Sequence, residues 1–260
     1  MPHASHTTKY TDPSAARHTG SKSRIPVGIQ IQFPNNSPLK IKTNLTEPNN
    51  ETAFTIGRDV PPLTMELDDG TPVLLRPVLP DDRERVRIAI EEMSRESRYR
   101  RFFTSTMNPS ADLLRYFTEV DKHHHVAWGA LDPSVEGQPG VGIARFIRDR
   151  DDPTVAEVAF TVRDDLQGLG LGTILLAILY HLAPVHGIKT LRANVLADSY
   201  SVADWLRSLG ARGKLESGVL EFDLMVSGHH SKLQQTPGTE RFRQRLQEVT
   251  GKLQRGQPTQ

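Results

Sequence analysis

Three glycines stand on alternate positions in the stretch "VRDDLQGLGLGT", Val162 to Thr173, between a charged turn and a long apolar run. Because Gly168, Gly170 and Gly172 have no side chains, the backbone N–H groups of this turn are open to a partner. The apolar run "TILLAILYHL" predicts a buried helix from Gly170 to about Leu182. Free N–H groups at the positive end of a helix dipole are typical of an anion-binding site.

Two common phosphate-binding motifs do not fit these glycines. A dinucleotide-binding fingerprint requires G-x-G-x-x-G and an acidic residue about 20 positions later. This chain has G-x-G-x-G, with Lys189 and Thr190 in that later region. A nucleoside-triphosphate loop requires a lysine after its last glycine, where this chain has Thr173. An anion cradle of another kind and a plain tight turn between strand and helix remain as the alternatives.

One carboxylate lies inside the strand that is predicted just before the glycines. In "TVAEVAFTV" the two-residue period of a strand places Glu157 on one face with Ala159 and Thr161, and Phe160 on the opposite, apolar face. Two roles are compatible with Glu157. Its carboxylate could accept a proton in a reaction beside the cradle, or it could form an ion pair with an arginine on a neighbouring strand, such as Arg145.

The elements that position these residues follow from periodicity and turn signals. A DDG turn and an alternating segment predict a strand that ends at Pro77, and "LPDDRERVRIAIEEMS" predicts a helix. Two short basic and aromatic helices follow, in "RESRYRRFF" and "SADLLRYFTEV", and then three antiparallel strands, in "HVAWGALD", "GVGIARFIRD" and "TVAEVAFTVRD". After the buried helix come a strand in "TLRANVL", a helix closed by Gly210 and a final strand in "GVLEFDLMV". This order predicts an α/β (α+β) fold, with a mixed, mostly antiparallel sheet and helices on both faces.

The run Gln167 to Gly172 resembles the Q/R-x-x-G-x-G/A signature of the GNAT superfamily of N-acetyltransferases, and it lies between a strand and a buried helix, where that signature belongs. The order of elements is also similar to the GNAT fold. Within the superfamily, "VLLRPVLPDDRERV", "ESRYRRFF" and "AEVAFTVRDDLQGLGLGT" most resemble the bacterial protein lysine acetyltransferases that act on acyl-CoA synthetases. The resemblance implies one GNAT acetyltransferase domain over residues 63–226.

The resemblance also implies a donor, an acceptor and a set of site residues. Acetyl-CoA is the expected acyl donor, and a protein such as an acyl-CoA synthetase is the expected acceptor. An alkylammonium with a pKa of about 10.4 must lose a proton before it attacks, and the glutamate of the matching "A-E-x-A" strand, Glu157, is the implied general base. The implied donor-binding residues are Phe160, Val162, Gln167, Gly168, Leu169, Gly170, Gly172, Thr173 and Ser199.

Two positions depart from the family pattern. The family commonly has an asparagine where the helix after "VLA" begins, and a tyrosine one turn before the closing Leu-Gly. Alignment on Leu209-Gly210 places Ser199 and Leu206 at these positions. The general acid is therefore unassigned, although a coenzyme A thiolate can leave with protonation by water. Ser199 either binds the pantetheine arm or caps the helix that follows it.

Polar segments flank the predicted domain. Residues 1–60 are rich in Pro, Asn, Ser and Thr without sustained periodicity, and they are expected to form a disordered flank. Residues 227–260 are expected to form a flexible tail that contains an amphipathic helix. The apolar residues of that helix keep helical spacing, so it packs either on the domain or on another subunit, which would create an oligomer. They are Phe242, Leu246, Val249 and Leu253.

Composition argues against several classes of protein. A net charge of +1 argues against general binding of nucleic acid or an anionic membrane, and no stretch is apolar enough to span a bilayer. The absence of cysteine excludes thiolate catalysis and disulfides and favours a cytoplasmic location. His123 to His125 alternate faces on a strand, so no metal site is predicted there. Arg98, Arg100 and Arg101 either line a docking face for an acidic protein or solvate a helix.

Three functions are compatible with these patterns. Acetyl transfer to a protein lysine is favoured by the resemblance. Acetyl transfer to a small amine uses the same donor site. A non-catalytic acyl-CoA sensor would also fit the leucine that stands in place of the family's tyrosine.

Overall fold

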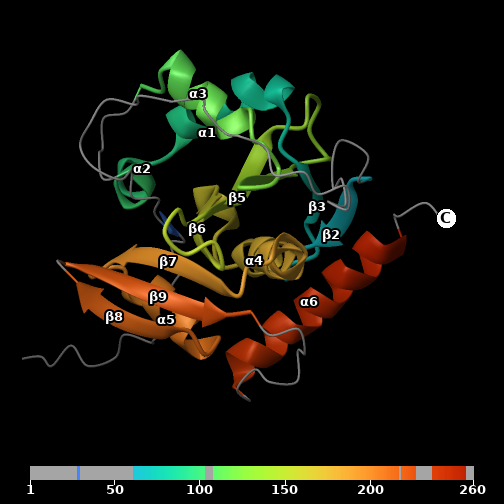
Figure 1. Cartoon of the computed structure of the whole chain (residues 1–260). Helices are drawn as coiled ribbons and strands as arrows, with labels where there is room; N and C mark the ends of the chain where they lie inside the picture. The colour runs from blue at the N-terminus through green and yellow to red at the C-terminus, as the bar shows by residue number, and fades with distance from the viewer. Residues whose placement is uncertain (1–27, 30–60, 103–107, 217, 227–235, 256–260) are drawn as a thin grey trace, which may run out of the picture.

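The computed structural model describes residues 28–29, 61–102, 108–216, 218–226 and 236–255, which form one mixed sheet with helices on both of its faces (Figure 1). The order of the strands across the main path of the sheet is β2 (Leu63–Glu66), β3 (Pro72–Pro77), β4 (His125–Leu131), β5 (Gly140–Arg148), β6 (Val155–Val162), β7 (Thr190–Leu196), β9 (Val219–Met225) and β8 (Arg212–Glu216). Neighbouring strands along this path are antiparallel except β6 and β7, which are parallel. The predicted fold class is confirmed.

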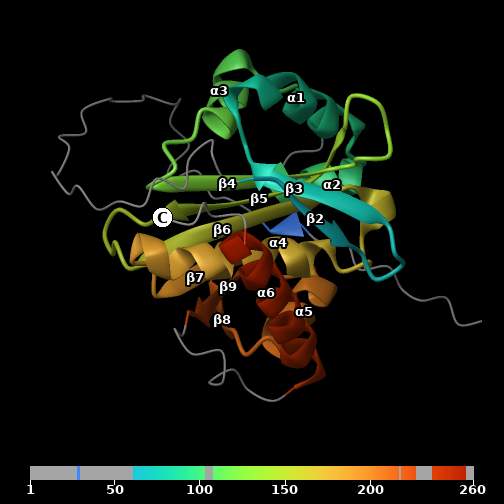
Figure 2. The same ribbon diagram turned by 90° about the vertical axis from the view of Figure 1, so that its right-hand side faces the viewer.

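Six α-helices in the described part of the chain are divided between the two faces (Figure 2). On one face lie α1 (Arg83–Glu92), α2 (Arg95–Phe102) and α3 (Ala111–Thr118); on the other lie α4 (Leu171–Leu182), α5 (Tyr200–Ser208) and α6 (Pro237–Arg255). Three short 3-10 turns complete the fold: η1 (Pro80–Asp82), η2 (Asp164–Leu166) and η3 (Ala183–His186). Within the described ranges, no helix has the length and apolar character that crossing a membrane requires.

Helix α4 is the centre of the main core. All of its residues are buried except His181, as the apolar sequence predicts. The helix gives way to η3 at Ala183, just before Pro184, and Gly187 leaves this turn with a φ of 70°, a left-handed value that favours glycine. The inward face of β6 packs in the same core, which holds the connection between β6 and α4 in place.

Helix α6 packs on the domain of its own chain. Its apolar stripe is buried against α4, and the rings of Phe242 and Tyr180 meet edge to face with centroids 5.3 Å apart. Thr250 also forms a hydrogen bond with Nδ1 of His181 at 3.0 Å. The folded unit therefore extends beyond Val226. The apolar face that was considered for an oligomer is covered within one chain.

One short strand lies inside the range that was expected to be disordered. Gly28–Ile29 form β1, which pairs antiparallel with β6 at Thr161 and Phe160 and lies next to α2 and β7. The expectation of a disordered flank is wrong for these two residues, because a two-residue strand carries no periodicity that sequence analysis could detect. The other residues of range 1–60, and residues 227–235 and 256–260 of the tail, lie outside the described residues.

Candidate active site

The connection from β6 to α4 contains the three glycines. Gly168 and Gly170 have φ values of 78° and 88°, in the left-handed region that L side chains rarely adopt. Gly170 is the N-cap of α4, and its carbonyl accepts the hydrogen bond of Ile174 N at 3.1 Å. The N–H groups of the first helical turn have no acceptor inside a helix. No described residue outside α4 accepts a hydrogen bond from residues 168–173.

Gln167 shapes this turn from within. Its side chain is buried, and its Nε2 donates to the carbonyl of Val162 at 3.1 Å and to Oδ1 of Asp164 at 2.9 Å. Both amide hydrogens are thus used to join the end of β6 to η2. A direct contact between Gln167 and a donor stays a prediction.

A carboxylate and two arginines lie at the edge of the glycine turn. A Cβ placed on Gly170 would lie 3.0–3.1 Å from the carboxylate atoms of Asp68, which belongs to the turn after β2. Asp68 is itself bound by two side chains of α6, Arg245 at 2.8 Å and Arg241 at 3.6 Å. Arg245 also pairs with Glu248 at 3.2 Å, so two guanidinium groups and two carboxylates balance in this cluster and it adds no net charge to the edge of the turn.

The edge of β6 opens between the glycine turn and Glu157. β6 pairs with β7 only from Val155 to Val158, opposite Thr190 to Ala193, and β1 takes the edge farther along at Phe160 and Thr161. The side chain of Phe160 is buried in the core, as is that of Val162. The two residues can therefore meet a donor through their backbone, whereas their side chains face away from it.

Glu157 is half-buried on the face of β6 that is turned towards α2 and α3. Arg101 and Tyr116 interact with it electrostatically: burial lowers the pKa of Arg101 to about 10 while Glu157 raises it, and burial raises the pKa of Tyr116. The proposed ion pair with Arg145 does not form. Nη1 of Arg145 instead meets Nε2 of His125 at 3.0 Å and the carbonyl of Phe117 at 3.4 Å.

The start of α5 lies next to α2. Ser199 is buried at the N-cap of α5, but its hydroxyl does not cap the helix and instead accepts a hydrogen bond from Arg100 Nη1 at 2.9 Å. This bond joins α2 to α5. Leu206 is buried in the core, so no acid stands where the family has its tyrosine. The three arginines of α2 do not form one surface, because Arg98 binds the end of α1 and Arg101 is buried.

Several residues of this region carry no signal in the sequence. Asp68 and Arg245 are 177 residues apart along the chain, and β1 also pairs with a strand far from it in sequence. Among the described residues, no group of three histidines and carboxylates could hold a metal ion. Asp121 accepts the backbone N–H groups of all three consecutive histidines through Oδ1, which explains the shape of that turn without an ion.

Comparisons with known proteins agree on one family. The Acetyltransferase (GNAT) family matches residues 88–211. Acetyltransferase Pat of Mycolicibacterium smegmatis is 39% identical over 156 residues, or 58% of this chain and 45% of that protein. Acetyltransferase PA5475 of Pseudomonas aeruginosa is 32% identical over 148 residues, or 57% of this chain and 79% of that protein. Among solved structures, the GNAT domain of S. lividans PAT matches 63% of this chain and 96% of that chain, with 29% identity and a TM-score of 0.57. The chain thus spans less than half of the Mycolicibacterium relative.

Proposed function

The chain belongs to the GNAT family of acetyltransferases, and from this premise we propose that it transfers an acetyl group from acetyl-CoA to the side-chain amine of a protein lysine. The observation that carries the proposal is the alignment of three features along β6: the glycine turn with its free N–H groups, the open edge, and Glu157. Their order matches the order of diphosphate, pantetheine arm and thioester in the donor.

The diphosphate of acetyl-CoA would lie on the N–H groups at the start of α4. Those donors point to one place at the positive end of a helix dipole, which suits two phosphate groups. At the edge of the same turn the charges of Arg241 and Arg245 are balanced by Asp68 and Glu248, so the N–H groups of α4 would supply the attraction for the diphosphate. The predicted contacts with Leu169, Gly172 and Thr173 belong to this part of the site.

The arm of the donor would extend from the turn towards Glu157 along the edge of β6 that β7 leaves after Val158. The backbone of β1 already pairs with part of this edge, so donor and β1 would compete for the same groups. The hydroxyl of Ser199 accepts a hydrogen bond from Arg100, and the arm would replace or share that bond.

Proton transfer would fall to Glu157. An amine cannot attack the thioester carbonyl while it is protonated, and a carboxylate within reach, directly or through one water, removes that proton. Attack forms the carbon–nitrogen bond, the carbon–sulfur bond breaks, and coenzyme A leaves as a thiolate that water protonates. No side-chain acid is assigned to that last step, because Leu206 is apolar and buried.

The similarity to Acetyltransferase Pat supports a protein acceptor, such as an acyl-CoA synthetase. Release of coenzyme A thiol from acetyl-CoA, measured with a panel of purified proteins and small amines, tests this. Thiol release with a protein, together with acetylated lysine in its peptides, is the expected result. Release with small amines alone would assign a small-amine acetyltransferase, and tight binding without release would assign an acyl-CoA sensor.

A cytoplasmic location is proposed on the cysteine-free composition.

A further inference from the structure

A cavity of about 370 Å³ lies between the sheet and the helices of the α1–α3 face. Its volume is within the range of small-ligand sites, and its walls are mainly apolar. These walls include Val86 and Ile90 of α1, Met93 at the C-cap of α1, Phe117 of α3 and Ile143 of β5. Charged side chains also line the cavity, and their partners decide what it can hold.

Two buried arginines contribute to the lining of the cavity. Arg101 of α2 is 4% exposed and Arg145 of β5 is 2% exposed, and both line the cavity. Nε of Arg101 donates to the hydroxyl of Thr161 at 3.1 Å. Nε of Arg145 is buried and has no hydrogen-bond partner. Neither guanidinium is within ion-pair distance of a described carboxylate.

The charges around these arginines do not balance. The arginines repel each other: burial first, and the charge of Arg101 second, lower the pKa of Arg145 to about 9. The ring of Phe117 lies under the Arg145 guanidinium at 4.5 Å and stabilises it in part. Glu157 supplies one negative charge at longer range. His125 is neutral, because Arg145 can only donate and Nε2 must accept. One positive charge therefore remains uncompensated in a desolvated place, which is costly without a partner.

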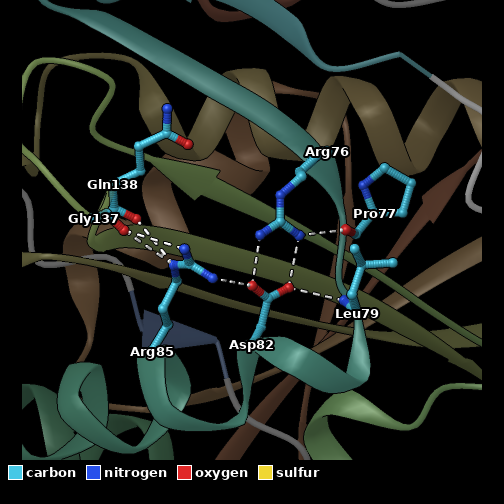
Figure 3. A network of polar contacts seen from close by, with 7 residues as sticks. All are labelled: Arg76, Pro77, Leu79, Asp82, Arg85, Gly137 and Gln138. Atoms are coloured by element: carbon cyan, nitrogen blue, oxygen red, sulfur yellow. Dashed lines mark hydrogen bonds and ion pairs between the residues drawn. The ribbon is translucent and has the colours of Figure 1, made fainter.

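The carboxylates that line the cavity do not supply that partner. Asp82 is held between Arg76 and Arg85, with oxygens 2.6 Å and 3.0 Å from their nitrogens (Figure 3). Asp165 pairs with Arg163 at 2.7 Å. The two others, at positions 92 and 164, are exposed at the rim. We therefore expect the uncompensated positive charge of Arg101 and Arg145 to be neutralised by an anion that enters the cavity from outside.

We propose that this cavity binds a carboxylate on a short apolar chain, with the carboxylate on Arg101 and Arg145 and the chain among the apolar side chains of α1 and β5. A carboxylate matches the planar fork of a guanidinium and carries the single charge that is missing. The apolar walls exclude a strongly hydrated dianion. An ammonium ion would meet two cations, so the cavity does not receive the amine acceptor.

The ligand has two chemical sources. It is either a free carboxylic acid or the carboxylate end of an acyl group carried by coenzyme A. The second source rests on the proposed function. Thr161 connects the two places, because its hydroxyl accepts a hydrogen bond from Arg101 at the cavity while its backbone lies on the edge of β6 where the donor arm is proposed to bind.

Calorimetry on the full chain with hexanoate and hexan-1-ol tests the free acid. Hexanoate should bind about tenfold or more tightly than the alcohol of the same length. Arg101→Gln should remove this difference, and Val86→Phe should reduce binding by filling the cavity while both arginines stay in place. Arg115→Gln, an exposed arginine of α3 that pairs with Asp112, is the matched control and should bind like the parent.

Turnover with succinyl-CoA and butyryl-CoA, each relative to acetyl-CoA in the same variant, tests the acyl source. These donors have acyl groups of four carbons and differ in the terminal carboxylate. If the parent prefers succinyl-CoA and Arg101→Gln abolishes this preference, the ligand is the acyl group carried by coenzyme A. If hexanoate binds as expected in the calorimetric experiment, the ligand is a free carboxylic acid. The proposal is overturned if hexanoate binds no better than hexan-1-ol and succinyl-CoA is no better than butyryl-CoA. Loss of turnover with acetyl-CoA itself would refute the proposed function instead, and the calorimetric result would still stand.

Discussion

Removal of the N-terminal segment should strengthen the binding of acetyl-CoA. β1 occupies the edge of β6 at Phe160 and Thr161, between the glycine turn and Glu157, where the arm of the donor is proposed to lie. The donor must displace β1 before it can bind. A chain without residues 1–58 is spared this step, and a chain without residues 1–20 retains Gly28–Ile29 and serves as the matched control.

The size of the effect follows from the extent of the pairing. Two residues in antiparallel register form about two backbone hydrogen bonds. Each contributes a net of about 0.5–1.5 kcal/mol, so the two together contribute about 1–3 kcal/mol. We take about 1 kcal/mol, the lower end of this range, because ordering the two residues costs entropy. This stabilisation corresponds to about a fivefold change in apparent affinity.

Thiol release at varied acetyl-CoA concentration measures this effect. We expect the KM for acetyl-CoA to fall about fivefold when residues 1–58 are absent, with kcat unchanged, since saturating donor displaces β1 in either chain. Calorimetric titration with coenzyme A gives the same comparison without turnover. Equal KM values for the two shortened chains would refute the competition, as would weaker binding in the chain that lacks β1.

Three further substitutions or conditions give separate outcomes. Gly170→Asp places a second carboxylate beside Asp68, and it should reduce the calorimetric affinity for coenzyme A about a hundredfold relative to Gly170→Ala. Gly170→Ala is the control because it has the same backbone strain. Equal affinities of the two variants would show that the diphosphate does not bind at this turn. Leu246→Ala, at a fully buried position of α6, should lower the free energy of unfolding in urea by about 2–5 kcal/mol, whereas exposed Gln247→Ala should change it by less than about 0.5 kcal/mol. Burial lowers the pKa of His125 to about 3, whereas the pKa in the unfolded chain is about 6.5. Between these two pH values the unfolded state binds more protons than the folded state, so the free energy of unfolding falls as the pH falls. The loss at pH 5 should be about 2 kcal/mol relative to pH 8, and His125→Gln should reduce it; an unchanged pH slope would place the titrating group elsewhere.

Local patterns account for the parts of the molecule that sequence predicted well. The alternation of β6, the glycine turn and the apolar α4 each involve neighbours along the chain, and each appears as predicted. The stripe of α6 likewise predicted an amphipathic helix. Periodicity shows that a face is buried but not what covers it, so the packing of α6 on α4 required the structure.

The residues that sequence did not identify depend on distant contacts or on unusual burial. Arginine is rarely buried, so nothing in "ESRYRRFF" or "GIARFIRD" distinguishes Arg101 and Arg145 from solvated side chains. The neighbours of Asp68 come from α4 and α6, far along the chain. Ser199 illustrates the same limit, because its position at an N-cap was predicted while its partner Arg100 was not.

The pH dependence of turnover in Glu157→Gln tests the central claim most directly. With saturating acetyl-CoA and a protein acceptor, the parent rate should level off as pH rises, and the variant should be slower by about a hundredfold or more near neutral pH. Its residual rate should climb with pH as hydroxide replaces the lost base, while donor affinity stays close to that of the parent. Glu216→Gln, on the exposed strand β8, should behave like the parent. Turnover of Glu157→Gln within about threefold of the parent across the whole pH range would contradict the role of Glu157 as the proton acceptor.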